Sequence, residues 1–198
     1  LYRTFLRKRL KTFFRFAMIG NIVFLMRSYY IGYMKTLYVI RHAKSSWDDP
    51  SLADFDRPLN KRGKHDAPKM GKRLHHREVV PDLLLSSPAE RAFTTCTILA
   101  EQIGYPQSKI KTNRNLYHAD DAQILSTVQA LDNKHNVVWI FGHNPGLTDF
   151  VNLIANAGID NIPTCGVVAC SLNISSWDEA NAKKASVVFF DYPKKKKD

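Results

Sequence analysis

Three short apolar runs constrain the fold of this chain more than any other feature of its sequence. They are TLYVI (36–40), DLLLS (82–86) and NVVWIFG (136–142). Short runs rich in branched and aromatic side chains are typical of strands that are buried on both faces of a sheet. Helical patterns separate them, so the sequence predicts an α/β fold: a three-layer sandwich with a mainly parallel central sheet flanked by helices.

The segments around these strands complete the expected order of elements. Helices are predicted at 61–78, 88–104, 120–131 and 144–158. Pro68 makes the first helix prone to a kink, whereas Pro88 and Gly104 suit the start and the end of the second. Further strands are predicted at 109–116, 165–174 and 184–192, the first of them at an edge of the sheet. The direction of the last strands is left open by the sequence.

The charge of the chain is concentrated at its two ends. The 198 residues are 44% hydrophobic, enough for one domain with a sizeable core, and carry a formal charge of +11. Residues 1–33 contribute +7 and the closing KKKKD (194–198) contributes +3, which leaves +1 for residues 34–193. A nearly neutral body lacks the basic stripe of a nucleic-acid-binding protein, and the lysine run is expected to be a solvated tail.

Residues 1–33 are basic, aromatic and free of acids, and we expect them to lie outside the fold. Their longest uncharged apolar run has 11 residues, between Arg15 and Arg27, whereas a membrane-spanning helix needs about 20. A transit peptide or an amphipathic surface segment would fit this composition. Because Met34 opens MKTLYVIRHA, we favour an over-extended or alternative gene start. The expected layout is an extension at 1–33, one domain at 34–193 and a tail at 194–198.

Three cysteines bear on the compartment and on metal binding. Cys96, Cys165 and Cys170 are odd in number, have apolar neighbours and lack the spacing of metal ligands. Buried, reduced thiols in a cytoplasmic protein are therefore expected, with no disulfide framework, no zinc site and no other cofactor.

Polar residues follow each of the three buried strands. Arg41 and His42 follow the first strand, SSPAER with Arg91 follows the second, and His143 follows the third. Because ligands bind at the carboxyl ends of the strands in open α/β sheets, we expect these side chains to meet at one edge. Arg91 lies in the first turn of a helix, where the helix dipole favours an anion. The expected cluster has two histidines, at least two arginines and no obvious carboxylate partner.

This combination of side chains indicates phosphoryl transfer. Guanidinium groups match phosphate oxygens and stay charged at any working pH. An imidazole that donates one ring N–H to a backbone carbonyl presents its other nitrogen as a neutral nucleophile. A second, protonated imidazole stabilises the charge that develops on the phosphoryl oxygens. The cluster therefore predicts a phosphohistidine intermediate that forms without a metal ion.

Four motifs occur in the order of a known family. VIRHA, RPLNKRG, SSPAERAFTT and FGHNPG span much of residues 34–175. In this order the chain resembles the histidine phosphatase superfamily, with its phosphoglycerate-mutase-like fold, and its RPL motif and short length resemble the small SixA-type phosphohistidine phosphatases. The resemblance implies a phosphatase that acts on a phosphorylated protein such as a histidine phosphotransfer domain.

The resemblance also implies roles for individual residues. His42 is the residue expected to be phosphorylated, with Arg41 and Arg91 binding the phosphoryl group and His143 cationic during transfer. Arg57, in DRPLN, is expected to fold its loop over the site. Lys44, Ser45 and Asn144 are further candidates at the mouth of the site.

The proton donor is the main departure from the family pattern. Mutases and many phosphatases of the superfamily carry a carboxylic acid before the second histidine, where this chain reads TNRNLYHADDAQIL. Asp120 is the candidate there, although Asp120 and Asp121 are both placed like helix-capping residues. The lack of a clear acid favours a phosphoramidate, whose leaving imidazole needs little acid catalysis. A small-molecule phosphomonoesterase and a non-catalytic phosphate-binding module are the alternatives.

Overall fold

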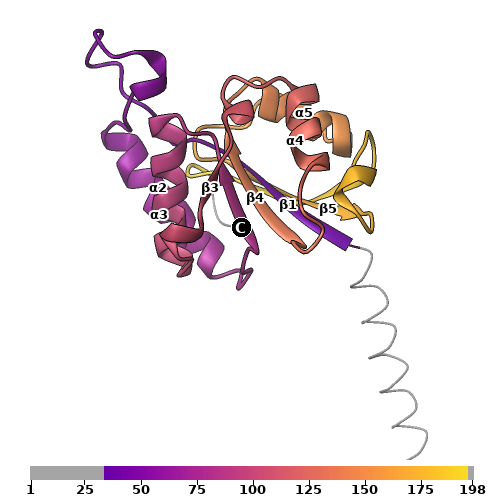
Figure 1. The fold of residues 1–198 in the computed structure, drawn as a ribbon. Helices are drawn as coiled ribbons and strands as arrows, with labels where there is room; N and C mark the ends of the chain where they lie inside the picture. The colour runs from indigo at the N-terminus through magenta and orange to yellow at the C-terminus, as the bar shows by residue number, and fades with distance from the viewer. Residues whose placement is uncertain (1–33, 196–198) are drawn as a thin grey trace, which may run out of the picture. The chain divides into compact units, whose positions relative to one another are not determined.

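A six-stranded sheet forms the middle layer of residues 34–195, the part of the chain that this computed structural model describes (Figure 1). The strand order is β3-β2-β4-β1-β5-β6. The strands are β1 (Met34–Arg41), β2 (Leu83–Ser86), β3 (Lys111–Thr112), β4 (Val137–Gly142), β5 (Val167–Asn173) and β6 (Ala185–Asp191). The first four are parallel to one another, and β6 is antiparallel to β5. The sheet is thus mixed, and parallel at its centre.

Two pairs of helices cover the two faces of the sheet. They are α2 (Lys61–His75) and α3 (Glu90–Ile103) on one face, and α4 (Asp121–Gln129) and α5 (Gly146–Ala155) on the other (Figure 1). Alternate residues of β1 divide between the two cores, because successive side chains of a strand point to opposite faces. Leu37 and Val39 belong to the core that includes α4 and α5 residues, and Tyr38 and Ile40 to the core that includes α2 and α3 residues. The predicted three-layer sandwich is confirmed.

The ends of several elements differ from the predictions. The edge strand predicted at 109–116 is only two residues long, because the 3-10 turns η2 (Gln107–Lys109) and η3 (Arg114–Leu116) flank it. The side chain of Asn113 caps η3 by accepting a hydrogen bond from the Asn115 N–H, which ends the extended conformation. The first predicted helix runs through Pro68 and ends at His75. The second ends where Gly104 adopts a left-handed φ of 71°.

The predicted extension at 1–33 and the end of the lysine tail at 196–198 lie outside the described residues. Within residues 34–195, no helix is long and apolar enough to cross a membrane. All three cysteines are buried, as predicted, and none is in a disulfide.

The glycine of RPLNKRG allows α2 to begin against the segment that follows His42. A Cβ at Gly63 would lie 2.2 Å from the Lys44 carbonyl oxygen, too close for any side chain. That oxygen accepts a hydrogen bond from the Asn60 N–H, and the Asn60 side chain in turn caps α2 by accepting from the Gly63 N–H. The close approach fixes the backbone beside His42.

We expect Gly63→Ala to lower the free energy of unfolding by about 2 kcal/mol, because the methyl group must displace backbone. Gly142→Ala is the control. There the added Cβ lies 3.4 Å or more from its nearest neighbours, which is ordinary van der Waals contact, so little loss of stability is expected. Urea unfolding of both variants measures the difference; equal stabilities would contradict the proposed contact.

Candidate active site

The two predicted histidines lie side by side at the carboxyl ends of the central strands. Arg41 at the end of β1 pairs with Gly142 of β4, and Ser86 of β2 pairs with Phe141, so the three strands end level. The ring centroids of His42 and His143 are 5.1 Å apart, and both side chains are buried. The structure therefore brings together two residues that lie 101 positions apart in the sequence.

A backbone hydrogen bond fixes the tautomer of His42. Its Nδ1 lies 2.7 Å from the Ala43 carbonyl oxygen. Because a carbonyl only accepts, Nδ1 carries the proton and Nε2 has a free lone pair. Burial lowers the pKa of His42 to about 4; the bond to Ala43 opposes this shift, and the positive charges of Arg91 and Arg41 add to it. His42 is therefore neutral at neutral pH, as a nucleophile must be.

His143 is held in place by the residue that follows β2, Ser87. Its Nε2 shares a 2.9 Å hydrogen bond with the Ser87 hydroxyl, while its buried Nδ1 has no partner among the described residues. Burial lowers the pKa of His143 far below its usual range, and the neighbouring His42 and Arg91 lower it further. This imidazole is neutral while no anion is bound. Its predicted cationic state during transfer requires the negative charge of a phosphoryl group to raise its pKa.

Arg41 is anchored to the segment that precedes β5. Its Nη1 donates to the Ile162 carbonyl (2.7 Å) and to Asn161 Oδ1 (3.2 Å). The Asn144 amide donates to the same two acceptors, so Asn144 helps to fix the turn that holds Arg41. The buried Nε of Arg41 has no partner among residues 34–195 and remains available to an anion. Asn161 and Ile162 lie outside the four motifs, so their role in holding Arg41 was not predictable from the sequence.

Arg57 and Arg91 meet on the carboxylate of Asp54. Arg91 donates through Nη1 to the Asp54 carbonyl and through Nη2 to Asp54 Oδ2 (2.8 Å). Arg57 donates through Nη1 to Asp54 Oδ1 (2.9 Å), and also to the Ser45 hydroxyl and the Ser46 carbonyl. The guanidinium groups of Arg57 and Arg91 thus share one carboxylate. The expectation of a cluster without a carboxylate partner is wrong, because Asp54 lies in a loop that the sequence places only near Arg57.

Two aromatic side chains complete the surroundings of Asp54. The Tyr117 hydroxyl donates to Asp54 Oδ2 (2.9 Å), and His118 Nε2 does so at 3.0 Å. Both rings lie against His143, with centroid distances of 5.5 Å for Tyr117 and 5.7 Å for His118. They come from LYHADD, a segment in which Asp120 was the predicted candidate. The left-handed φ of 52° at His118 has no signal in the sequence.

The remaining predicted candidates have local roles. The exposed Asp120 is the N-cap of α4, where it accepts from the Gln123 N–H (2.8 Å) as part of a capping box. Ser45 accepts from Arg57, and the carbonyl of Lys44 accepts from Asn60. Asp120 is thus occupied as a helix cap rather than aligned as a proton donor.

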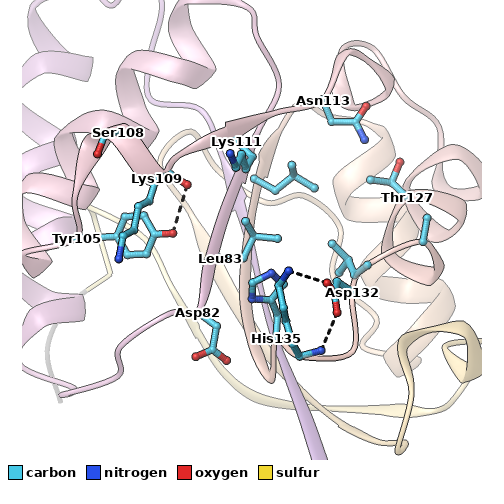
Figure 2. A pocket seen from close by; sticks show the side chains of 14 residues that line it. Asp82, Leu83, Tyr105, Ser108, Lys109, Lys111, Asn113, Thr127, Asp132 and His135 are labelled. Carbon is cyan, nitrogen blue, oxygen red and sulfur yellow. Dashed lines mark hydrogen bonds and ion pairs between the residues drawn. The ribbon is translucent and has the colours of Figure 1, made fainter.

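A pocket of about 540 Å³ lies elsewhere, along the edge formed by β2 and β3 (Figure 2). Asp82 and His135 in its wall precede β2 and β4, so they lie at the amino ends of these strands. A second acid in the wall, Asp132, forms an ion pair in which its Oδ2 lies 2.7 Å from Lys134 Nζ. The histidines and arginines of the candidate active site do not line this pocket: His42, His143, Arg41, Arg57 and Arg91. Among residues 34–195, no group of three metal-ligating side chains is placed to hold a metal ion.

Comparison with known proteins agrees with this geometry. The sequence model of the histidine phosphatase superfamily (branch 1) matches residues 37–120. An uncharacterised chloroplastic protein of Arabidopsis thaliana is 33% identical over 156 residues, which cover 75% of this chain and 71% of the relative. The chain belongs to the histidine phosphatase superfamily. It is accordingly a phosphatase, a hydrolase that acts on phosphorylated substrates.

Solved structures assign the branch of the superfamily. A putative phosphohistidine phosphatase SixA from Agrobacterium tumefaciens is 26% identical, with a TM-score of 0.68 over 80% of this chain and 98% of that one. A protein histidine phosphatase SixA complexed with tungstate has the same TM-score at 20% identity, over 80% of this chain and 97% of that one. This histidine phosphatase is of the SixA type, and its fold also matches a phosphoglycerate mutase from Bacillus anthracis (TM-score 0.59).

The lowered pKa of His42 makes the stability of this histidine phosphatase depend on pH. The unfolded chain binds a proton on this imidazole below about pH 6.5, whereas the folded protein does so only near pH 4. We therefore expect His42 to lower the free energy of unfolding by about 2 kcal/mol between pH 7 and pH 5. His42→Asn should lose this part of the pH dependence. Urea unfolding in buffers without phosphate or sulfate measures it, and identical pH dependence in both proteins would contradict it.

Proposed function

We propose that this enzyme hydrolyses protein phosphohistidine through a phosphohistidine intermediate on His42. The supporting observation is the pair of buried imidazoles, of which His42 has Nδ1 fixed by the Ala43 carbonyl and Nε2 free. A binding module would need neither a neutral nucleophilic nitrogen nor a second histidine beside it. The reduced state expected of the three buried thiols suits a cytoplasmic enzyme.

The reaction proceeds in two displacements at phosphorus. His42 Nε2 attacks the phosphoryl group, the bond from phosphorus to the leaving nitrogen breaks, and that nitrogen keeps the electron pair and takes up a proton. Water then attacks the phosphorus of phosphorylated His42, loses a proton and releases inorganic phosphate while the P–N bond breaks. Arg41, Arg57 and Arg91 bind the phosphoryl oxygens in both steps, and the phosphoryl charge raises the pKa of His143 so that it donates to them.

The surroundings of the site favour a leaving group that needs little acid catalysis. Burial opposes ionisation of Asp54, but hydrogen bonds from Arg91, Tyr117 and Arg57 outweigh burial and hold its pKa below the usual range. Asp54 is thus ionised, and Asp120 caps α4. Imidazole leaves phosphorus readily. An alkoxide instead needs a proton donor, and general acid catalysis typically raises the rate by about 10²–10⁴-fold.

A small-molecule phosphomonoesterase is the second candidate. The exposed imidazole of His118 lies beside His143 and would be the proton donor that an alkoxide leaving group requires. Its substrates would then be sugar phosphates and nucleotides, whose alkoxide leaving groups need such a donor.

Comparative kinetics distinguish these candidates. We expect kcat/KM for a phosphohistidine peptide or phosphoramidate to exceed that for sugar phosphates and nucleotides by about 100-fold or more, because only the latter need a general acid. Equal or reversed values would favour the phosphomonoesterase.

The role of His42 is tested separately. His42→Ala should abolish turnover and the acid-labile phosphoenzyme that rapid quenching traps from the wild type. His65→Ala, which changes an exposed histidine of α2, should leave both unchanged. Undiminished activity of His42→Ala would refute the mechanism for either substrate.

A further inference from the structure

The carboxylate of Asp54 receives donors from four side chains of the candidate active site. Arg57 binds one of its oxygens, and Arg91, Tyr117 and His118 bind the other, all at 2.8–3.0 Å. Burial and the bond to Asp54 raise the pKa of Tyr117, so its hydroxyl stays protonated and remains a donor. Several hydrogen-bond donors around one anionic group, guanidinium groups among them, are also the environment that binds phosphoryl oxygens.

Asp54 reaches this cluster from a surface loop. Its side chain is 38% exposed, whereas those of Arg91 and Arg57 are 4% and 8% exposed. Asp54 begins the short 3-10 turn η1 (Asp54–Asp56), and residues 47–53 before it are all exposed. The arginines are therefore fixed in the protein, while the carboxylate can withdraw toward solvent without opening the core.

An ionised carboxylate at this position competes with a phosphoryl group. Both are anions, and both require the same Nη atoms of Arg57 and Arg91. If both anions were present together, their repulsion in a partly buried site would weaken binding of the phosphoryl group. A phosphoryl group can bind only to those molecules in which the Asp54 carboxylate has left the two arginines. The apparent affinity is therefore reduced in proportion to the fraction of molecules in that state.

We propose that Asp54 is an internal substitute for the phosphoryl group: it holds Arg57 and Arg91 in place in the empty enzyme, and the substrate displaces it. This rests on the proposed function, which assigns the two arginines to phosphoryl binding. The same exchange in reverse assists release of phosphate, since the returning carboxylate satisfies the two buried cations. Asp54 is thus a positioning residue that sets the affinity for substrate and product.

Titration of the full chain with inorganic phosphate by calorimetry tests the proposal. Asp54→Asn removes the competing charge and keeps the size of the side chain, so we expect the Kd for phosphate to fall about tenfold and the KM for phosphoramidate to fall with it. Asp56→Asn is the matched control, because it removes the same charge from an exposed position of the same turn. Its Kd and KM should equal those of the wild type.

The sign of the effect distinguishes displacement from a purely structural role. If Asp54 only supported the arginines, Asp54→Asn would bind phosphate more weakly, and an unchanged or higher Kd therefore overturns the proposal. Should Asp54→Asn fail to fold by circular dichroism, Tyr117→Phe provides a second test. It removes one donor to the carboxylate without changing charge, and should lower the Kd about threefold; an unchanged or higher Kd again overturns the proposal.

A third variant separates this inference from the proposed function. Arg91→Ala should abolish measurable phosphate binding if Arg91 binds phosphoryl oxygens. Retained binding by Arg91→Ala would refute that assignment and the displacement together. Lost binding by Arg91→Ala, with no tightening in Asp54→Asn, would refute the displacement alone.

Discussion

Hydrogen bonds that continue past the ends of the central strands hold this active site together. The His42 N–H donates to the Gly142 carbonyl (3.1 Å), and the Ser87 N–H donates to the Phe141 carbonyl (2.8 Å). The parallel ladders thus extend into the segments that carry the functional side chains. Because the backbone on each side is tied to β4, His42 and His143 meet without depending on a flexible loop.

Burial of this edge determines its electrostatics. Two imidazoles and three guanidinium groups lie close together, and the imidazoles respond by giving up their protons, since an imidazole can become neutral and a guanidinium cannot. The arginines instead find acceptors. Arg41 uses backbone and amide oxygens, while Arg57 and Arg91 use the Asp54 carboxylate. The cations of this edge therefore bind an anion that belongs to the protein itself, the carboxylate of Asp54.

Much of the site was predictable because it lies on regular elements. Arg41, His42 and His143 directly follow buried strands, and Arg91 lies in the first turns of a helix that follows another, so the rule for parallel sheets brings them to one edge. Asp54, Tyr117 and His118 were not predictable in this way. They lie in irregular segments far apart in the chain, and their meeting depends on how the loop before α2 folds over the sheet.

The alternation of strand and helix and the residues at the strand ends determined by themselves the three-layer fold, the parallel centre of the sheet and the meeting of the two histidines. Side-chain periodicity is a local property of the chain, and a helical crossover between two neighbouring strands makes them parallel. Only the tertiary structure decided that Arg57 and Arg91 share the carboxylate of Asp54, that Tyr117 and His118 join them there, and that burial also lowers the pKa of His143. These outcomes depend on burial and on distances between groups that the chain brings together only when it is folded.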